Sequence, residues 1–383
     1  MEKTLFITND FPPQSGGIQT FIEGLIQQMP FGSVVVHTSS QRNESEQEFY
    51  DQQILERYGV IVVRDRQRIL LPTPGLRKRV AGTIHAHEIT TVVFGASVPL
   101  GLVASSLRKY GVRRIVAITH GHEVWWSKVP FFAQLLRRVG RSVDYLTHLG
   151  SFTKGAIAQA LHPQDVAKLV PLAPGVDVER FHPGEKSVAL IDRYELADKQ
   201  IILCVGRLVQ PKGQDVLIKA MSKVKQEYPQ AQLLIAGAGN YEKRLRKLVE
   251  RDNVHDRVTF VGRVAYEELP ELFRLADIFA SPTRDRFAGL EVEGLGIVYL
   301  EASASGVPVI AGNSGGSPDA VRSGVTGLIV NGRDVEEVGT ALVELLADAD
   351  KRRDFGAQGR RWMEEEWSWT VMGSRFRRLL DVD

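Results

Sequence analysis

The chain has 383 residues, a length that suits two domains of ordinary size. Hydrophobic residues make up 43% of it and charged residues 25%, which is typical of globular proteins and excludes collagen-like, coiled-coil and disordered classes. The formal charge of +2 conceals an asymmetry, because residues 1–175 carry 19 Lys and Arg against 13 Asp and Glu, whereas residues 176–383 carry 29 against 33. We therefore expect the two halves to meet different partners.

Cys204 is the only cysteine of the sequence, which excludes an internal disulfide and argues against a cysteine-bound zinc ion. The apolar stretch Leu5–Ile7 near the N-terminus is too short for a signal peptide. No apolar segment is long enough to cross a bilayer as a helix. These features predict a cytoplasmic protein that is peripheral to a membrane at most.

Short apolar runs alternate with segments of helical spacing through the first half. We expect strands at Thr4–Thr8, Ser33–Thr38, Gly59–Val63, Thr91–Phe94, Arg114–Thr119, Tyr145–Leu149 and Lys168–Pro171. Helical spacing is clearest at Ile18–Met29, Pro99–Tyr110 and Phe131–Ser142.

The alternation restarts near residue 200. Here we expect strands at Gln200–Val205, Gln232–Ala236, Val258–Val261, Ile278–Ala280, Val307–Ala311 and Gly327–Val330. Strands rich in Val, Ile and Leu, separated by helices, indicate parallel sheets covered on both faces. The predicted fold class is α/β, with two Rossmann-like domains at 1–174 and 175–368 that face each other across a deep cleft.

Loops that follow parallel strands are the first places to look for ligand-binding residues. Gly16 and Gly17 precede a helix after the first strand, where small residues and a helix N-terminus suit an anion. A glycine-rich helix entry without a ligand explains the pair equally well. Gly237 and Gly239 follow a later strand, but they lack the third glycine of a dinucleotide fingerprint, and a tight turn would also explain them.

Arg207 and Lys212 lie in the loop after the strand Gln200–Val205. A planar guanidinium and a compact ammonium group beside free backbone N–H groups suit a diphosphate. The alternative is a pair of solvated surface cations.

The segment from Glu293 to Glu301 is the most informative part of the sequence. Gly294 and Gly296 interrupt the chain before a helical segment that begins at Ile297, so Glu293 belongs to a loop and Glu301 to the helix. The two carboxylates can then contact different parts of one extended ligand, while N–H groups near Gly296 and Ile297 meet its phosphates. Two exposed glutamates would be the simpler explanation, but apolar and glycine neighbours argue against it.

Histidines form two further candidates. His120 and His122 follow the strand Arg114–Thr119, and His85 and His87 repeat the spacing in what reads as a loop. No third metal ligand recurs at a known distance, so we expect no metal site and a role for His120 beside the substrate.

These residues together resemble the retaining GT-B glycosyltransferases of family 4, through Arg207, Lys212 and the Glu293-x7-Glu301 motif. A narrower resemblance links the chain to the members that use GDP-mannose to extend phosphatidylinositol mannosides. It rests on three strings, which are Thr8–Gln19, His120–Glu123 and Glu293–Ala302. The resemblance implies an α-1,6-mannosyltransferase acting on a phosphatidylinositol mannoside lipid in glycolipid biosynthesis.

The resemblance also implies roles for single residues. Arg207 and Lys212 would bind the GDP diphosphate, with Gly16 and Gly17 against it from the other domain. Glu301 would bind the ribose, and the backbone of Val264 would meet the guanine. Glu293 would contact the mannose near its C3 hydroxyl, His120 would reach it near C6, and Asp10 would lie on the acceptor side.

The same resemblance implies a reaction without a divalent metal or other cofactor, in which the departing phosphate accepts the acceptor proton on the front face. Cations and helix N-termini would stabilise the leaving group instead. Asp348 and Asp350 form an Asp-x-Asp pattern, but they lie in a polar C-terminal helix and read as surface charge.

Basic residues suggest an anionic membrane surface as a partner of the first half, on the inner face of the plasma membrane. They are Arg64, Arg66, Arg68, Arg77, Lys78, Arg79, Arg137, Arg138 and Arg141. In the helix Phe131–Ser142, Phe131, Phe132, Leu135 and Val139 can share a face that lies on the bilayer. An ordinary core-facing helix with solvated arginines is the alternative. Nucleic acid is not expected, because no basic stripe interleaved with aromatic residues is present.

Other functions stay open at this stage. A family 4 transferase with another nucleotide sugar or acceptor would share most of these residues. A nucleotide-sugar 2-epimerase would share the two-domain architecture but need no acceptor, and a lipid-binding protein without activity could keep the fold. A C-terminal helix at about 369–383 is expected to cross back to the first domain and, with the link near 175, to form a hinge for domain closure.

Overall fold

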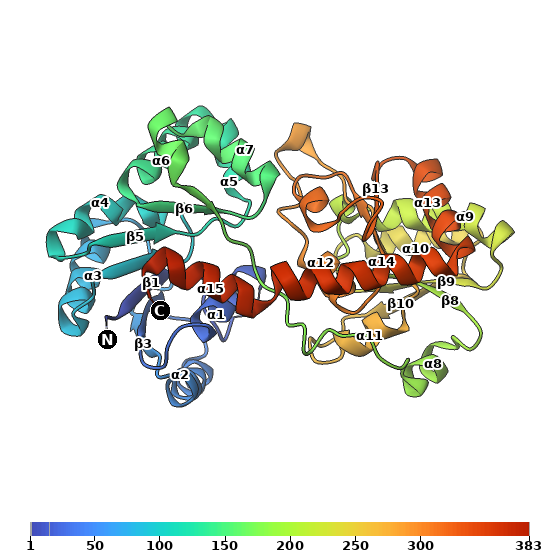
Figure 1. Cartoon of the computed structure of the whole chain (residues 1–383), viewed down its shortest axis with the longest axis horizontal. Coiled ribbons are helices and arrows are strands. Elements are labelled where there is room, and N and C mark those ends of the chain that lie inside the picture. The colour runs from blue at the N-terminus through green and yellow to red at the C-terminus, as the bar shows by residue number, and fades with distance from the viewer. Residues whose placement is uncertain (1, 15, 383) are drawn as a thin grey trace. The chain divides into compact units, whose positions relative to one another are not determined.

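The computed structural model describes residues 2–14 and 16–382 (Figure 1). Two compact units make up the chain: an N-terminal unit of Met1–Gly175 with Trp369–Asp383, and a C-terminal unit of Val176–Ser368. The first boundary follows Gly175, within the Pro/Gly-rich link at 173–184.

The N-terminal unit is built on a seven-stranded sheet in the order β3-β2-β1-β4-β5-β6-β7. Its strands are β1 (Thr4–Thr8), β2 (Val34–Ser39), β3 (Ile61–Asp65), β4 (Thr91–Phe94), β5 (Arg114–Ala117), β6 (Tyr145–His148) and β7 (Leu169–Pro171). All neighbouring strands are parallel. Its helices are α1 (Gly17–Gln27), α2 (Glu44–Tyr58), α3 (Pro74–His87), α4 (Ala104–Leu107), α5 (Glu123–Lys128), α6 (Pro130–Ser142), α7 (Ser151–Ala160) and α15 (Trp369–Leu380).

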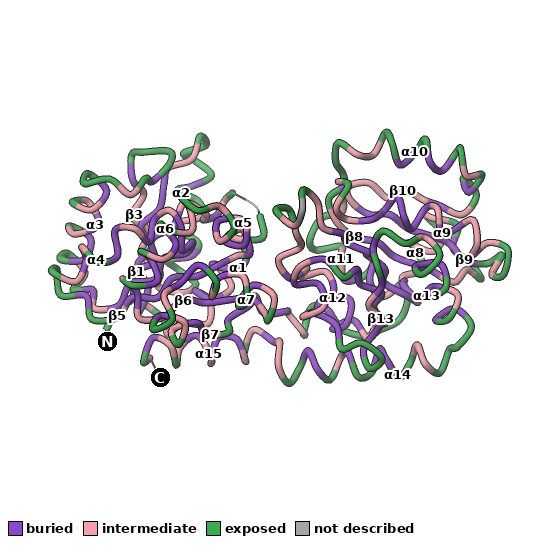
Figure 2. The backbone as a smooth tube through the Cα atoms, turned by 90° about the horizontal axis from the view of Figure 1, so that it is seen from above, coloured by how far each residue is buried: buried purple, intermediate pink, exposed green. Residues whose placement is uncertain are grey.

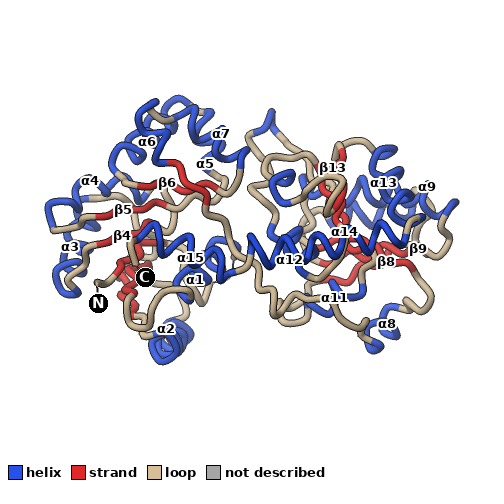
Figure 3. The backbone as a smooth tube through the Cα atoms, in the orientation of Figure 1, coloured by secondary structure: helices blue, strands red, loops and turns tan. Residues whose placement is uncertain are grey.

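The C-terminal unit repeats this plan on a six-stranded parallel sheet in the order β10-β9-β8-β11-β12-β13. Its strands are β8 (Gln200–Val205), β9 (Ala231–Ala236), β10 (Val258–Gly262), β11 (Ile278–Ser281), β12 (Val309–Gly312) and β13 (Gly327–Val330). Its α-helices are α8 (Val188–Tyr194), α9 (Gln214–Glu227), α10 (Glu242–Arg251), α11 (Leu269–Leu275), α12 (Ile297–Ala304), α13 (Val335–Ala347) and α14 (Ala349–Trp362). Figure 3 shows how helices and strands alternate within each unit. The predicted α/β class with two Rossmann-like domains is confirmed.

Apolar residues on both sides of each central strand explain why the sheets are covered on two faces. Every residue of β1 and of β9 is buried, and Figure 2 shows buried strand segments inside each unit with exposed backbone outside them. The predicted strands match the observed ones to within a few residues at either end, because short Val/Ile/Leu runs of this kind have no other stable position in a parallel α/β fold.

The segment Pro99–Tyr110 differs from its prediction as one helix. It forms a 3-10 turn at Leu100–Val103, the short α4, and a second 3-10 turn at Arg108–Tyr110. The hydroxyl of Ser106 donates to the carbonyl of Val103 at 2.6 Å, and such local side-chain bonds compete with regular helical hydrogen bonding.

The helix α15 completes the N-terminal unit although it is far from it in sequence. The ring of Phe376 lies 5.9 Å from that of Phe6 in β1, and both side chains are fully buried. Trp369 occupies the space beside Gly24 and Gly175, where an added Cβ would come within 3 Å of its indole. These contacts place α15 in the N-terminal unit.

Candidate active site

The predicted donor residues lie in loops at one edge of the C-terminal sheet. Arg207 and Lys212 follow β8, Val264 follows β10, and Glu293 lies between β11 and α12. Because the strands are parallel, these loops all leave carboxyl ends on the same edge of the sheet. The strands β10, β9, β8 and β11 are neighbours in that order.

The loop after β8 has a tightly defined backbone. Gly213 ends it in the left-handed region with φ 75°, and an added Cβ would lie 2.0 Å from the carbonyl oxygen of Pro282. The side-chain amide of Gln214 donates to the carbonyl of Arg207 at 3.1 Å, while the Arg207 side chain stays exposed. The backbone of this loop is therefore fixed by contacts with Pro282 and Gln214, while the Arg207 side chain faces solvent.

A cavity of about 220 Å³ brings Arg207 and Val264 together. It is lined by Val205, Gly206, Arg207, Ala236, Gly237, Ala238, Arg263, Val264 and Leu269, so the ends of three strands border it. An added Cβ on Gly237 would lie 1.9 Å from the Gly206 carbonyl oxygen, and one on Gly239 would lie 2.2 Å from that of Leu208. These glycines allow two loops to pack closely, as expected if they serve a tight turn rather than a dinucleotide fingerprint.

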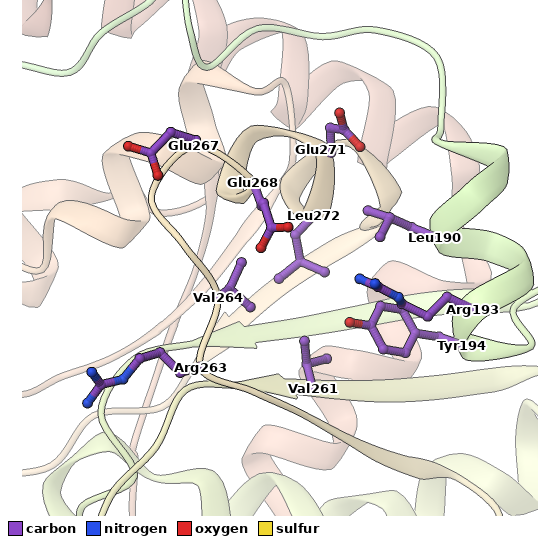
Figure 4. A pocket seen from close by; sticks show the side chains of 10 residues that line it. All are labelled: Leu190, Arg193, Tyr194, Val261, Arg263, Val264, Glu267, Glu268, Glu271 and Leu272. Atoms are coloured by element: carbon purple, nitrogen blue, oxygen red, sulfur yellow. The ribbon is translucent and has the colours of Figure 1, made fainter.

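A larger cavity of about 480 Å³ also borders Val264 (Figure 4). Glu268 extends into it near the start of α11, and Arg193 and Tyr194 extend into it from α8. Among the six strands of the sheet it touches β10 alone. The loops after β8, β9 and β10 converge instead on the smaller cavity, at the edge of the sheet where ligands of parallel α/β folds commonly bind.

Lys212 and Glu293 form an ion pair with 2.6 Å between Nζ and Oε2. Their side chains are 19% and 18% exposed, so both charges are largely withdrawn from water. The structure thus brings together Lys212, which is predicted to bind the diphosphate, and Glu293, which is predicted to bind the sugar. The two residues are 81 positions apart in the sequence.

The loop after β12 holds the backbone of Glu293 and was not predicted from the sequence. The hydroxyl of Ser314 accepts the Glu293 N–H at 3.2 Å and donates to Asp285 at 2.6 Å. The Gly316 N–H donates to the Glu293 carbonyl at 2.8 Å. The glycine pair Gly315 and Gly316, in the loop that follows a strand, was the available signal, because glycines after strands also singled out the other loops.

Glu301 lies in the second turn of α12 and is only 4% exposed. Burial raises the pKa of this carboxyl to about 7. Among the described residues no side chain or backbone group hydrogen-bonds to it. Gly296, with φ 84°, precedes the helix, and the N–H groups of Ile297 and its neighbours in the first turn point out of the helix end.

In the N-terminal unit, Asp10 and Gly17 frame the entry of α1. Gln19 donates to the Asp10 carboxylate at 3.1 Å, and the Asp10 N–H donates to the Thr8 hydroxyl at 2.9 Å. An added Cβ on Gly16 would meet the Gln19 side chain, whereas Gly17 has open space around it. Both glycines are exposed, so the helix entry is accessible.

His120 has a defined tautomer. Its Nε2 lies 2.5 Å from the carbonyl oxygen of Gly95, which can only accept, so Nε2 carries the proton. Burial lowers the pKa of His120, opposed by the charges of Glu123 and Asp10. The ring is therefore neutral, and Nδ1 keeps a lone pair that can accept a hydrogen bond.

Glu123 is a further residue with no predicted role. It is fully buried at the start of α5 and accepts hydrogen bonds from Ser97 at 2.7 Å and from the N–H groups of His120 and Gly121 at 3.0 and 3.1 Å. Its carboxylate thereby fixes the backbone that carries His120.

A cavity of about 540 Å³ lies beside Asp10, at the carboxyl ends of β1, β2 and β3. It is lined by Asn9, Asp10, Gln14, Ser39, Ser40, Gln41, Arg42, Arg68 and Ile69. In the described part of the chain neither Arg42 nor Arg68 has a hydrogen-bonding or ion-pair partner. Ile69 and Leu71 next to it are 64% and 52% exposed.

The basic residues of this unit divide into two groups. Arg64 pairs with Asp51 at 2.7 Å and Arg79 pairs with Asp65 at 2.5 Å, so these two serve the fold. Arg66, Arg68 and Lys78 are exposed.

The predicted apolar face of α6 is wrong in part. Val139 is fully buried together with Leu136, whereas Phe131 is 65% exposed, so the two do not share a lipid-facing surface. Arg137 donates to the carbonyl of Ala160 at 2.9 Å. The helix is core-facing at its centre, as the alternative interpretation had it, with an exposed aromatic residue at its start.

The remaining candidates lie away from these loops. His85 and His87 are in the last turn of α3, not in a loop. Asp348 caps α14 and Asp350 pairs with Arg353. Within residues 2–14 and 16–382 there is no group of three His, Cys, Asp or Glu side chains that could hold a metal ion, and no helix is long and apolar enough to cross a membrane.

Solved structures with the GT-B fold share this architecture. Anabaena Alr3699/HepE, solved with UDP, has a TM-score of 0.82 at 18% identity and matches 99% of both chains. Sucrose-phosphate synthase from Thermosynechococcus elongatus has a TM-score of 0.76 at 20% identity, over 99% of this chain and 98% of that one. The predicted GT-B fold is confirmed.

Sequence comparison identifies the family. Residues 191–362 match the family described as Glycosyl transferases group 1. A GDP-mannose-dependent alpha-(1-6)-phosphatidylinositol monomannoside mannosyltransferase of Mycobacterium tuberculosis is 42% identical over 100% of this chain and 99% of its own. The corresponding enzyme for the monoacylated acceptor in Corynebacterium glutamicum is 44% identical over 100% and 98%. The chain belongs to the group 1 glycosyltransferases.

Proposed function

We propose that the protein is a retaining mannosyltransferase that moves mannose from GDP-mannose to a phosphatidylinositol mannoside lipid and forms an α-1,6 linkage. The observation that carries this proposal is the end-to-end similarity, at 42–44% identity, to enzymes named for that reaction. The ion pair of Lys212 and Glu293 supports it, as does the buried Glu301 in α12, because these three groups suit a diphosphate, a sugar and a ribose, respectively.

The donor diphosphate binds Arg207 and Lys212 in this proposal. The first-turn N–H groups of α12, near Gly296 and Ile297, add the positive end of a helix dipole. Together they stabilise the charge that develops on the departing GDP without a divalent metal. The ribose hydroxyls donate to Glu301, which supplies the partners that its carboxylate lacks.

Two side chains are proposed to accept hydrogen bonds from the mannose. Glu293 accepts from its C3 hydroxyl, and neutral His120 accepts at Nδ1 from its C6 hydroxyl. The acceptor hydroxyl attacks from the face that the GDP leaves, and the departing phosphate takes its proton. The protein then contributes positioning and charge stabilisation rather than a covalent nucleophile.

The cavity beside Asp10 suits the anionic headgroup of the acceptor. Arg42 and Arg68 carry charges with no partner in the described structure, and Ile69 and Leu71 offer an apolar margin for a lipid. We place the protein on the inner face of the plasma membrane, as a peripheral protein. Sedimentation with anionic vesicles that is abolished by salt supports this, and equal sedimentation with neutral vesicles contradicts it.

Transfer of radiolabelled mannose tests the proposal. Arg207→Ala and Lys212→Ala are expected to lower transfer at least about 100-fold, because each removes a charge that stabilises the leaving group. Lys243→Ala, on the exposed face of α10, is the matched control and should leave activity unchanged. Near-normal transfer by either site variant would overturn the diphosphate assignment.

The products distinguish the remaining functions. Release of an epimerised sugar without an acceptor would indicate a 2-epimerase, and transfer from another nucleotide sugar would indicate a different group 1 enzyme. Binding of lipid without turnover of any donor would indicate a lipid-binding protein. Full inhibition by excess EDTA that is reversed by a divalent metal would overturn metal independence.

A further inference from the structure

A buried ion pair connects the two loops that carry the donor-binding side chains. Nη2 of Arg284, in the loop after β11, lies 2.9 Å from the Asp215 carboxylate at the start of α9. The two side chains are only 8% and 11% exposed. Burying a charge costs free energy unless the charge is paired, so each of these side chains requires the other. The contact therefore fixes the position of both chain segments.

Backbone contacts place this pair directly beneath the phosphate-binding loop. The Arg284 N–H donates to the Pro211 carbonyl at 2.9 Å, one residue before Lys212. Asp215 follows Gly213 by two residues, and Gly213 lies against Pro282 of the Arg284 loop. The Tyr241 hydroxyl donates to the same carboxylate at 3.3 Å and closes the network.

Stability alone does not account for such a pair, because well-packed apolar residues of similar volume are commonly as stabilising as a buried ion pair. What an ion pair adds is a defined distance between two chain segments. Here the segments are 69 residues apart, and they carry Lys212 on one side and Glu293 on the other. A small displacement of either loop would separate the groups that must act on one ligand.

We infer that Arg284 and Asp215 are positioning residues that hold the Arg207–Lys212 loop at the distance from Glu293 that the nucleotide sugar requires. The inference rests on the proposed donor site. It predicts that a loss of the pair weakens donor binding while acceptor binding in the N-terminal unit stays unchanged.

A second ion pair in the same unit provides a matched control. Lys186 lies 2.9 Å from Asp277, which also accepts the N–H of Ile201 at the amino end of β8. This pair joins chain segments at the opposite edge of the sheet from the donor loops. Asp277→Asn therefore perturbs an ion pair of the C-terminal unit without touching those loops.

The experiment measures donor KM, kcat and thermal unfolding for Asp215→Asn, Arg284→Lys, Arg284→Met and Asp277→Asn in the full chain. We expect Arg284→Met and Asp215→Asn to raise the donor KM at least tenfold, and Arg284→Lys to restore part of the loss. Backbone hydrogen exchange at residues 206–213 should rise in the two disabling variants. Asp277→Asn should lower the unfolding temperature with the donor KM unchanged.

The double variant Asp215→Leu with Arg284→Met removes the pair without leaving a buried charge, so it keeps the test informative if a single variant fails to fold. A folded double variant with a wild-type donor KM would overturn the inference. So would an equal rise of the donor KM in Asp277→Asn. Wild-type protein that turns over no nucleotide sugar would instead overturn the proposed function, which separates the two failures.

Discussion

Glu301 shows how a residue that we propose to bind a ligand can reduce stability in the free protein. Its pKa is raised by burial from 4.5 to about 7, so the folded state binds a proton more tightly than the unfolded chain does. Stability contributed by this group is therefore lost as the pH rises from about 4.5 to about 7. A ligand with two hydroxyl donors would reverse this effect, because it favours the ionised carboxylate.

Glu301→Gln is accordingly expected to stabilise the free protein at pH 8 by up to about 3 kcal/mol, and by about 1 kcal/mol or less at pH 5. The same substitution should weaken donor binding. Denaturant unfolding at the two pH values measures the first effect. Glu250→Gln, on the exposed surface of α10, is the control. Equal stabilisation at both pH values would contradict the argument.

Glu293 neutralises Lys212 in the free protein, and this contact has to be exchanged when a donor binds. Glu293→Gln should release Lys212 for a diphosphate and remove a nearby negative charge. We expect GDP to bind several-fold more tightly while mannose transfer falls at least about 100-fold. Calorimetric titration with GDP measures the expected gain in affinity, and the transfer assay measures the expected loss of activity. Weaker GDP binding in the variant would show that the carboxylate does not compete for Lys212.

At the scale of elements, the turn into α9 depends on a residue without a side chain. Gly213 and Gly324 both have φ 75°, but an added Cβ meets Pro282 at the first and open space at the second. Gly213→Ala and Gly324→Ala should each lose about 1–2 kcal/mol to left-handed strain. Only Gly213→Ala should also displace the phosphate-binding loop and raise the donor KM. Comparing the donor KM of the two variants separates the effect of the clash with Pro282 from the effect of left-handed strain.

The elements, and the edge of the sheet on which the proposed donor loops lie, were predictable because both follow from local pattern. Apolar runs gave the strands, and the position of Arg207, Lys212 and Glu293 directly after or between strands gave the edge of the sheet on which they meet. The residues that hold these loops in place were not predictable. Asp215 and Arg284 are 69 residues apart, and nothing in either neighbourhood indicates that they meet.

The helix α6 shows the same limit in another form. Periodicity indicated an apolar face of Phe131, Phe132, Leu135 and Val139, but it did not decide whether that face meets a bilayer or the core. Packing against the neighbouring helices and the turn Leu100–Val103 decided it, with Leu136 and Val139 buried. Local pattern therefore predicts what an element is, while contacts between elements decide which of its side chains remain available.

At the scale of the whole molecule, the N-terminal unit depends on residues that follow the C-terminal unit. Phe376 is fully buried beside Phe6, so Phe376→Ala should cost the N-terminal unit about 3–5 kcal/mol. The core cluster described for the C-terminal unit does not include Phe376, so the unfolding of that unit should stay unchanged. Calorimetry or unit-resolved hydrogen exchange checks this, with exposed Arg378→Ala as the control. A loss spread equally over both units would contradict it.

The return of α15 to the N-terminal unit has a consequence for synthesis. The strands β1 to β7 leave the ribosome first, but the helix that covers Phe6 and Phe21 is translated only after the whole C-terminal unit. At typical rates of 5–20 residues per second, that delay is roughly 10–40 s. During it, the surface of Phe6 and Phe21 that α15 later covers stays open, so the unit that is made first cannot complete its core until the last residues are translated.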